Sequence, residues 1–253
     1  VLSQILSATF VLYFLRKKTE LTVRLLSLEE IRGCWNRAKN IISLGTAGFI
    51  MQLTNSLVTI CCNNVLSVTG GDLYISVMTI VSSIRQIIDT PIHAITEGSS
   101  PVISYNYGAR RPKRVFQSWL TMSVMAILYT LLAWGVILFA PRFLIGIFSS
   151  DQTLITDAIP ALKLYFGAFV FQALQYVGQT MFKSLGKKKF AIFFSLLRKV
   201  IIVVPLTYIL PYLFHMGSDG VFLAEPVSNV LGGSACFIVM LCTVMPELKR
   251  MAK

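Results

Sequence analysis

Charged residues are scarce in this 253-residue chain. Only 13% of the residues are Asp, Glu, Lys or Arg, and only 11 are acidic, whereas ordinary soluble domains carry roughly 25% charged residues. The hydrophobic fraction is 55%. This composition excludes a disordered chain and a disulfide-stapled mini-protein, and it excludes a typical cytosolic enzyme.

Histidine and cysteine are also few, and they lack the spacing of metal ligands. The set consists of His93, His215, Cys34, Cys61, Cys62, Cys236 and Cys242. Zinc sites place such residues in short, paired intervals, so we expect no metal site and no cofactor. No H-E-x-x-H, G-x-S-x-G, Walker or dinucleotide-binding pattern is present. We therefore expect no enzyme; an intramembrane enzyme is the weakest alternative, because it requires a nucleophile or a metal at depth.

Long apolar runs make up most of the chain. A membrane span needs about 20 residues, and backbone groups inside a bilayer must be paired within a helix or a closed barrel. The runs show no period of two, which favours helices. The predicted spans are 41–66, 74–105, 116–140, 160–185, 190–214 and 220–245. The predicted fold class is all-α, a polytopic membrane helix bundle with six complete transmembrane helices.

A shorter apolar run opens the sequence. Residues 1–15 are too few for a span, and Arg16, Lys17 and Lys18 follow the run. A signal peptide has its positive charges before the apolar run. We expect these residues to be the end of a preceding helix, and the chain to be part of a longer protein.

The net charge of +12 arises from basic residues in alternate connections. Seven, four, four and three Lys or Arg lie in 16–40, 106–115, 183–189 and 246–253. The other connections, 67–73, 141–159 and 211–219, contain none, one and none. Basic connections stay on the cytoplasmic side, so we expect a multi-pass protein of the cell (inner) membrane with a cytoplasmic C-terminus. Membrane lipids are then partners of these residues, and nucleic acid is not.

The longest polar connection is 16–40. Its apolar residues, among them Leu21, Leu25 and Leu28, indicate an amphipathic helix on the membrane surface. A solvated linker with one apolar face packed on the bundle explains the same pattern, and both interpretations remain open.

Four ionisable residues recur within the second predicted span at intervals of four: Arg85, Asp89, His93 and Glu97. This spacing places them on one helix face. Each costs about 2.5–3.5 kcal/mol at the centre of a membrane helix. We predict an ion-coupling site for a proton or another cation. The alternative is a structural Arg85–Asp89 pair with Glu97 wetted at the interface.

Uncharged polar residues align on two other predicted spans: Gln52, Asn55 and Thr59, and Gln172, Gln175 and Gln179. Amides beside aromatic residues suit a cavity for cationic or amphipathic ligands, whereas hydrogen bonding between helices explains them equally well.

We also assign Arg198, Glu225 and Asn229 to this substrate cavity. Arg198 and the adjacent Lys199 are expected to extend partly towards the interface. Glu225, near the outer end of its span, is expected to be half-buried.

Three stretches resemble the multidrug and toxic compound extrusion (MATE) family of secondary transporters. They are TEGSSPVISYNYGA at 96–109, GVFLAEP at 220–226 and SLGKKK at 184–189. The resemblance covers almost the whole chain and implies a twelve-helix protein of two six-helix lobes. It makes 1–15 the end of the last helix of the N-terminal lobe, 16–40 a cytoplasmic linker, 41–246 the C-terminal lobe and 247–253 a cytoplasmic tail.

The resemblance implies efflux of cationic or amphipathic compounds, coupled to inward movement of protons or sodium ions. Several branches of the family carry acidic cation-binding residues on the counterparts of 41–66 and 160–185, where this sequence has no Asp or Glu. The coupling site then lies in the N-terminal lobe, a partner absent from this sequence, or at Asp89, His93 and Glu97.

Two other functions remain as alternatives. A lipid-linked or polysaccharide flippase of similar architecture would line its cavity with several Arg for phosphate groups, and here only Arg85 and Arg198 are candidates. A non-transporting membrane bundle would leave the ionisable residues of 74–105 without a function.

Overall fold

The computed structural model describes residues 2–18 and 35–251, and every regular element in these ranges is a helix. The chain divides into two units, residues 1–46 and 47–253, which are described separately. In the first unit, α1 (Leu2–Lys18) confirms the helix predicted for the opening run. The surface helix considered for 16–40 falls mainly on 19–34, outside the described residues, and α3 already begins at Trp35.

The second unit holds the remaining helices. They are α3 (Trp35–Thr69, from residue 47), α4 (Gly71–Gly108), α5 (Pro112–Phe139), α6 (Pro141–Gly146), α7 (Gln152–Tyr165), α8 (Phe169–Ser184), α9 (Lys188–Leu196), η1 (Leu197–Val203), α10 (Val204–Tyr212), α11 (Gly217–Ser228), η2 (Asn229–Gly233) and α12 (Ser234–Met251). The two segments η1 and η2 are π-helical and continue the helices on either side of them.

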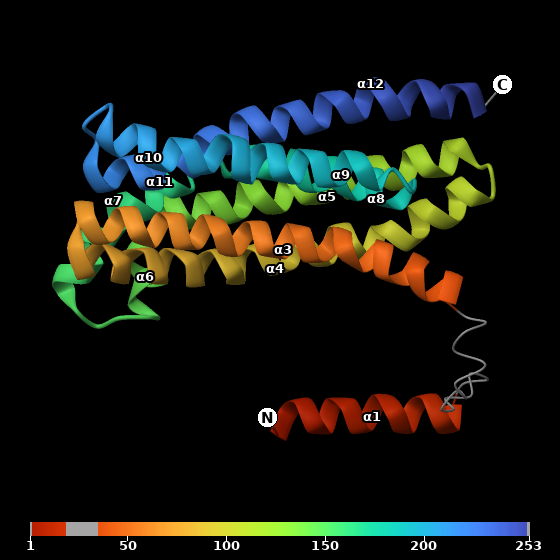
Figure 1. The fold of residues 1–253 in the computed structure, drawn as a ribbon, viewed down its shortest axis with the longest axis horizontal. Helices are drawn as coiled ribbons and strands as arrows, with labels where there is room; N and C mark the ends of the chain where they lie inside the picture. Colours follow the sequence, from red (N-terminus) through yellow and green to blue (C-terminus); the bar gives the residue numbers. More distant parts are fainter. Residues whose placement is uncertain (1, 19–34, 252–253) are drawn as a thin grey trace. The chain divides into compact units, whose positions relative to one another are not determined.

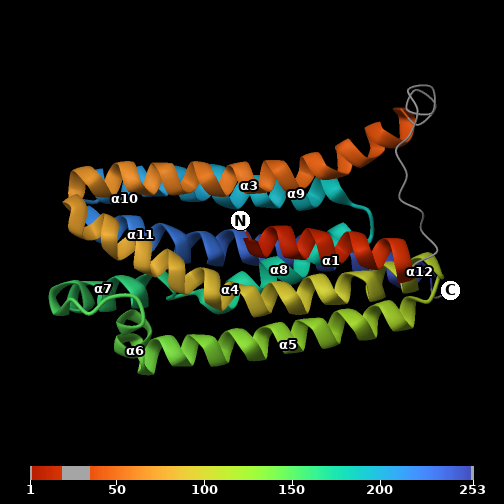
Figure 2. The ribbon, with the colours of Figure 1, turned by 90° about the horizontal axis from the view of Figure 1, so that it is seen from below.

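The helices of the second unit run lengthwise beside one another as a bundle, with α6 and α7 at one end and the end of α12 at the other (Figures 1 and 2). α4 packs against α5, α7 and α8, and α11 packs against α10 and α7. In the described part of the chain, three helical stretches are long and apolar enough to cross a membrane: Pro112–Phe139, Lys189–Tyr212 and Gly217–Met251. The consecutive helices α7 and α8 form a fourth if they are counted as one broken span.

The prediction of one continuous helix over 160–185 is wrong. Helix α7 starts at Gln152, and the chain bends by 50° between α7 and α8. Phe166 and Phe169 flank the bend, both are about 1% exposed, and their rings meet edge to face at 5.2 Å. The bend buries both rings in the core, and hydropathy did not reveal it because the residues on both sides are equally apolar.

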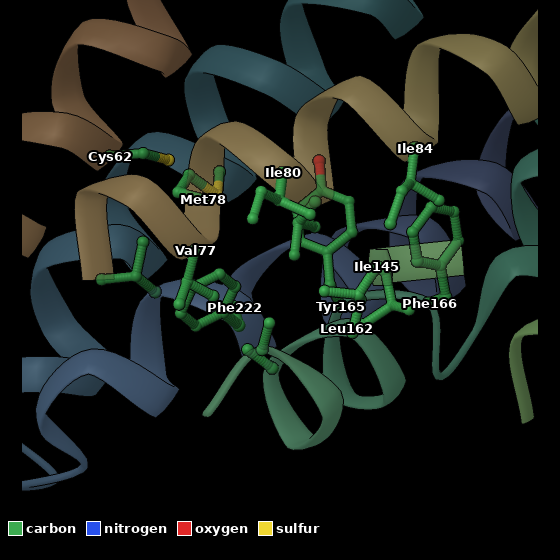
Figure 3. Packing of buried hydrophobic residues seen from close by; sticks show 14 of the residues in the cluster. Cys62, Val77, Met78, Ile80, Ile84, Ile145, Leu162, Tyr165, Phe166 and Phe222 are labelled. Atoms are coloured by element: carbon green, nitrogen blue, oxygen red, sulfur yellow. The ribbon is translucent and has the colours of Figure 1, made fainter. Parts of the chain in front are cut away.

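The apolar core consists of two clusters, and α4 passes from one to the other. The first cluster includes Val77, Ile84 and Ile88 of α4 with Leu162 and Phe222 (Figure 3). The second includes Ile92 and Ile103 of α4, packed with residues of α5, α8, α9 and α12. The ionisable residues Arg85, Asp89 and His93 lie on the stretch of α4 where the two clusters meet. Polar side chains are therefore placed between two apolar layers.

The close approach of α11 to α10 depends on Gly220, which belongs to the GVFLAEP stretch. A Cβ atom at this position would lie 2.8 Å from the backbone nitrogen of Pro211 and 2.9 Å from the carbonyl carbon of Leu210. Backbone atoms cannot move aside as a flexible side chain can. We expect Gly220→Ala to lower the free energy of unfolding by about 1–3 kcal/mol, the usual cost of overpacking, measured by thermal unfolding of the purified protein in detergent.

Gly135→Ala is the matched control, because a Cβ atom there meets nothing within 4 Å and alanine favours a helix over glycine by about 1 kcal/mol. We expect no loss of stability for this variant. Equal melting temperatures for Gly220→Ala and Gly135→Ala would contradict the close packing of α10 and α11.

Candidate functional site

Arg85 of α4 connects three helices through its guanidinium group. Its Nε lies 3.2 Å from Oδ2 of Asp89, which confirms the predicted pair on one helix face. Its Nη1 lies 2.7 Å from Oε1 of Glu225 on α11 and donates a hydrogen bond to the hydroxyl of Tyr165 on α7. Figure 3 shows the Tyr165 hydroxyl directed towards α4.

Glu225 accepts hydrogen bonds from two further cations. Nη1 of Arg198 lies 3.2 Å and Nζ of Lys199 lies 3.1 Å from the same Oε1 atom, and Lys199 also lies 3.4 Å from Oε2. The Glu225 side chain is 4% exposed, so the prediction of a half-buried carboxylate was wrong. The partial extension predicted for Arg198 and Lys199 was wrong too, because both cations turn inward to this carboxylate.

Two π-helical segments carry groups that pack around Glu225. Arg198 and Lys199 are neighbours in η1, and their long side chains are both buried and both reach Glu225. Pro205 follows η1 and has no N–H to continue the α-helical hydrogen bonds. η2 packs on η1, and a Cβ at Gly232 would lie 2.9 Å from Cγ of Arg198. Single π-turns of this kind often occur at functional sites.

Asp89 has partners on α8 as well as on its own helix. Its carboxylate accepts hydrogen bonds from Gln172 Nε2 at 3.3 and 3.4 Å and from the Tyr176 hydroxyl at 3.2 Å. The ring of Tyr176 also packs on His93, with the centroids 4.6 Å apart. Asp89 thus accepts hydrogen bonds from two side chains of α8, and one of them, Tyr176, offers an aromatic surface beside it.

A cavity of about 290 Å³ opens between these side chains. Eight of the residues predicted for the two sites line it: Asn55, Thr59, Arg85, Asp89, His93, Gln175, Gln179 and Arg198. The remaining walls include Cys62, Tyr165, Tyr176, Ser195 and Lys199. An open cavity of this size, with charged and amide side chains on its wall, can enclose part of an organic ligand and an ion.

The other predicted site residues lie elsewhere. Gln172, Glu225 and Asn229 are buried and form hydrogen bonds to residues of the cavity wall. Gln52 is exposed and is not part of the lining. Glu97 is also outside the lining; its side chain is 56% exposed and pairs with Lys183 at 3.1 Å.

Three contributors to the site were not predicted. Lys199 was named beside Arg198 but was expected to extend towards the interface, and so it was not assigned to the cavity. Tyr176 counted only among the aromatic residues beside the glutamines, without a role of its own. Tyr165 resembled the other aromatic residues of apolar runs, although a tyrosine near a buried ionisable residue is a usable signal.

Known proteins resemble the chain in sequence and in fold. The model of the family described as MatE matches residues 48–209. The multidrug export protein MepA of Staphylococcus saprophyticus is 24% identical over 236 residues, which are 92% of this chain and 50% of MepA. The chain therefore spans about half the length of this curated relative.

Two solved structures share the fold. One is described as the outward-facing conformation of a multidrug resistance MATE family transporter, with a TM-score of 0.82, 22% identity and coverage of 98% of this chain and 55% of that chain. The other is described as the inward-facing conformation of such a transporter, with a TM-score of 0.80, 21% identity and coverage of 100% and 57%.

Proposed function

Since the chain belongs to the MatE family of membrane transporters, we propose that it forms the C-terminal lobe of a secondary active efflux transporter. The lobe would take up cationic or amphipathic drugs and toxic compounds at its cavity and release them outside the cell. Inward movement of a coupling cation, a proton or a sodium ion, would drive the export.

The observation that carries this proposal is the charged cavity within an apolar helix bundle. Arg85, Asp89, Arg198 and Lys199 all line it, although each ionisable group inside a membrane costs several kcal/mol. Such groups in a membrane protein commonly mark an ion or substrate pathway. A purely structural bundle does not need four of them around one cavity.

Alternating access is supported by the fold comparisons. The same chain matches the outward-facing structure with a TM-score of 0.82 and the inward-facing one with 0.80. A lobe that keeps its internal fold in both conformations is suited to rock as one body against a second lobe. We propose an N-terminal six-helix lobe as that partner, with residues 1–15 as the end of its last helix, 16–40 as the linker and 41–246 as the second lobe.

The proposed orientation follows from the basic connections. Residues 106–115 and 183–189 and the tail 247–253 would face the cytoplasm and contact anionic lipids. The protein would lie in the cell (inner) membrane, with six complete spans in this chain and a cytoplasmic C-terminus.

We place substrate binding at Asp89, with Arg85 and His93 beside it, and ion coupling in the same cavity. Among the described residues that line the cavity, Asp89 is the acidic one. The Tyr176 ring offers an aromatic face to an organic cation. This negative charge would hold a cationic substrate, and the coupling cation would be exchanged for that substrate within the cavity. Glu97 pairs with Lys183 outside the cavity, so we give it no part in the exchange.

The proposal is tested with the full-length protein in proteoliposomes loaded with ethidium, a fluorescent monocation. An inward proton or sodium gradient is expected to drive ethidium out, and a collapsed gradient is expected to stop it. If neither gradient moves ethidium but a fluorescent lipid crosses the bilayer, the flippase alternative replaces the proposal.

The structure places a third cation at the cavity, as the flippase alternative requires, but that cation is already paired. Lys199 joins Arg85 and Arg198 at the cavity, as phosphate binding would require. All three, however, share the single carboxylate of Glu225, which occupies the position that a phosphate would take.

A further inference from the structure

The charges around the cavity do not balance. The buried charge cluster, defined as Arg85, Asp89, Arg198, Lys199 and Glu225, contains three cationic side chains and two carboxylates. Their side chains are between 4% and 15% exposed. In the described part of the chain, the acids Glu97 and Glu247 pair with other lysines, Lys183 and Lys187. The cluster therefore carries one positive charge too many when every member is ionised.

A buried excess charge is unfavourable, and only one member of the cluster can remove it by losing a proton. Arginine stays protonated in proteins, whereas a lysine amine in a buried site gives up its proton readily. Lys199 lines the cavity, so its proton has a path to the space in which a substrate would bind. A neutral Lys199 amine can still donate one hydrogen bond to Glu225.

We propose that Lys199 carries the proton that is exchanged for a cationic substrate. This inference rests on the proposed function and makes the coupling ion a proton. When a monocation enters from the cytoplasm, the Lys199 ammonium releases one proton to the cytoplasmic water and becomes an amine. When the cation leaves to the outside, the amine takes one proton from the external water. One proton moves in for each monocation that moves out, and the cluster with its contents keeps the same net charge.

Other charged and titratable groups face Lys199 and influence its proton exchange. The charged ones are Arg85 and Asp89 of α4, Arg198 of η1 and Glu225 of α11. The titratable groups on the same wall are Cys62 of α3, His93 of α4, Tyr165 of α7 and Tyr176 of α8. Cys62 and the two tyrosines are neutral at pH 7. Asp89 and His93 are the two groups that could carry the proton instead, and the experiment separates them from Lys199.

The test measures proton release when ethidium binds to the full-length protein in weakly buffered detergent solution containing a pH-indicator dye. We expect about one proton per ethidium bound, and an ethidium affinity that rises by up to about tenfold per pH unit between pH 6 and 8, as linkage of one proton requires. A wild-type protein that binds ethidium without releasing a proton overturns the proposal.

Two variants fix Lys199 in one charge state each. Lys199→Met is neutral at every pH, so it is expected to bind ethidium at least as tightly as wild type, with no proton release and no pH dependence. Lys199→Arg keeps the charge and the contact with Glu225, so it is expected to fold and to bind ethidium about tenfold more weakly, again with no proton release. Lys183→Met, which removes an exposed lysine outside the cavity, is expected to behave as wild type.

Proton release that persists in Lys199→Arg overturns the proposal and assigns the proton to Asp89, to His93 or to another part of the protein. That result leaves the proposed function intact if wild type still exports ethidium from proteoliposomes. The proposed function fails separately, when no gradient drives any export by wild type.

Discussion

Asp89→Asn is expected to weaken ethidium binding to the full-length protein by about 10- to 100-fold. A hydrogen bond or ion contact to a charged group contributes about 1.5–3 kcal/mol, and each 1.4 kcal/mol is a factor of ten in affinity. Asparagine has nearly the same shape and still accepts a hydrogen bond from Gln172, so the fold should persist. The change removes a negative charge from the wall and leaves the buried charge cluster more positive, which disfavours any cation.

The same variant should lose gradient-driven export. Export requires a bound substrate, so a variant that no longer holds the cation in the cavity also loses the exchange of that cation for a coupling ion. Binding is measured by the increase in ethidium fluorescence, and export by its efflux from proteoliposomes.

Glu97→Gln is the matched control, since it neutralises another acid on the same face of α4. Glu97 is 56% exposed and paired with Lys183, and an exposed pair contributes about 0–1 kcal/mol. We expect less than about a twofold change in ethidium affinity. If Glu97→Gln loses ethidium binding and Asp89→Asn does not, the ethidium-binding site lies outside the cavity.

Glu225→Ala is expected to destabilise the protein by about 3–5 kcal/mol, the usual cost of breaking a buried ion pair by removing one partner. Glu225 is the shared acceptor of Arg85, Arg198 and Lys199, so its loss leaves three cations with little compensation. The measurement is thermal unfolding in detergent, together with the yield of folded protein.

A second substitution should restore part of this loss. Adding Lys199→Met to Glu225→Ala removes one uncompensated cation and replaces it with an apolar side chain of similar length, a type of exchange that is often neutral in protein interiors. Glu247→Ala is the comparison, because that carboxylate is 31% exposed beside Lys187 and should cost about 1 kcal/mol or less. Equal effects of Glu225→Ala and Glu247→Ala would contradict the central position of Glu225.

The part of the site on α4 could be predicted from sequence because it depends on helix periodicity alone. Arg85 and Asp89 are four residues apart, and they pair as that spacing requires. His93 also lies on the cavity wall, whereas Glu97, one turn further, does not. The spacing alone could not show where along α4 the cavity ends, because the residues of α8 and η1 that enclose it come from distant sequence.

The convergence on Glu225 could not be predicted, since it depends on contacts between three helical segments that are distant in sequence. Hydropathy places Arg198, Lys199 and Glu225 within two predicted spans. It does not show which faces of the helices pack against each other. In the structure two adjacent cations of the π-helical segment η1 reach one carboxylate. The bend at 166–168 was missed although Gly167 lies within it, because a single glycine in an apolar run does not by itself end a helix; in the structure the buried rings of Phe166 and Phe169 lie on either side of it.

The central claim is that the exported compound binds in the cavity beside Asp89, and a structure of the full-length protein with bound ethidium tests it most directly. We expect density for the dye between α4 and α8, with its ring system against Tyr176 and its charged ring closest to the Asp89 carboxylate. Density for the dye only at a site that contacts neither α4 nor α8 would contradict it.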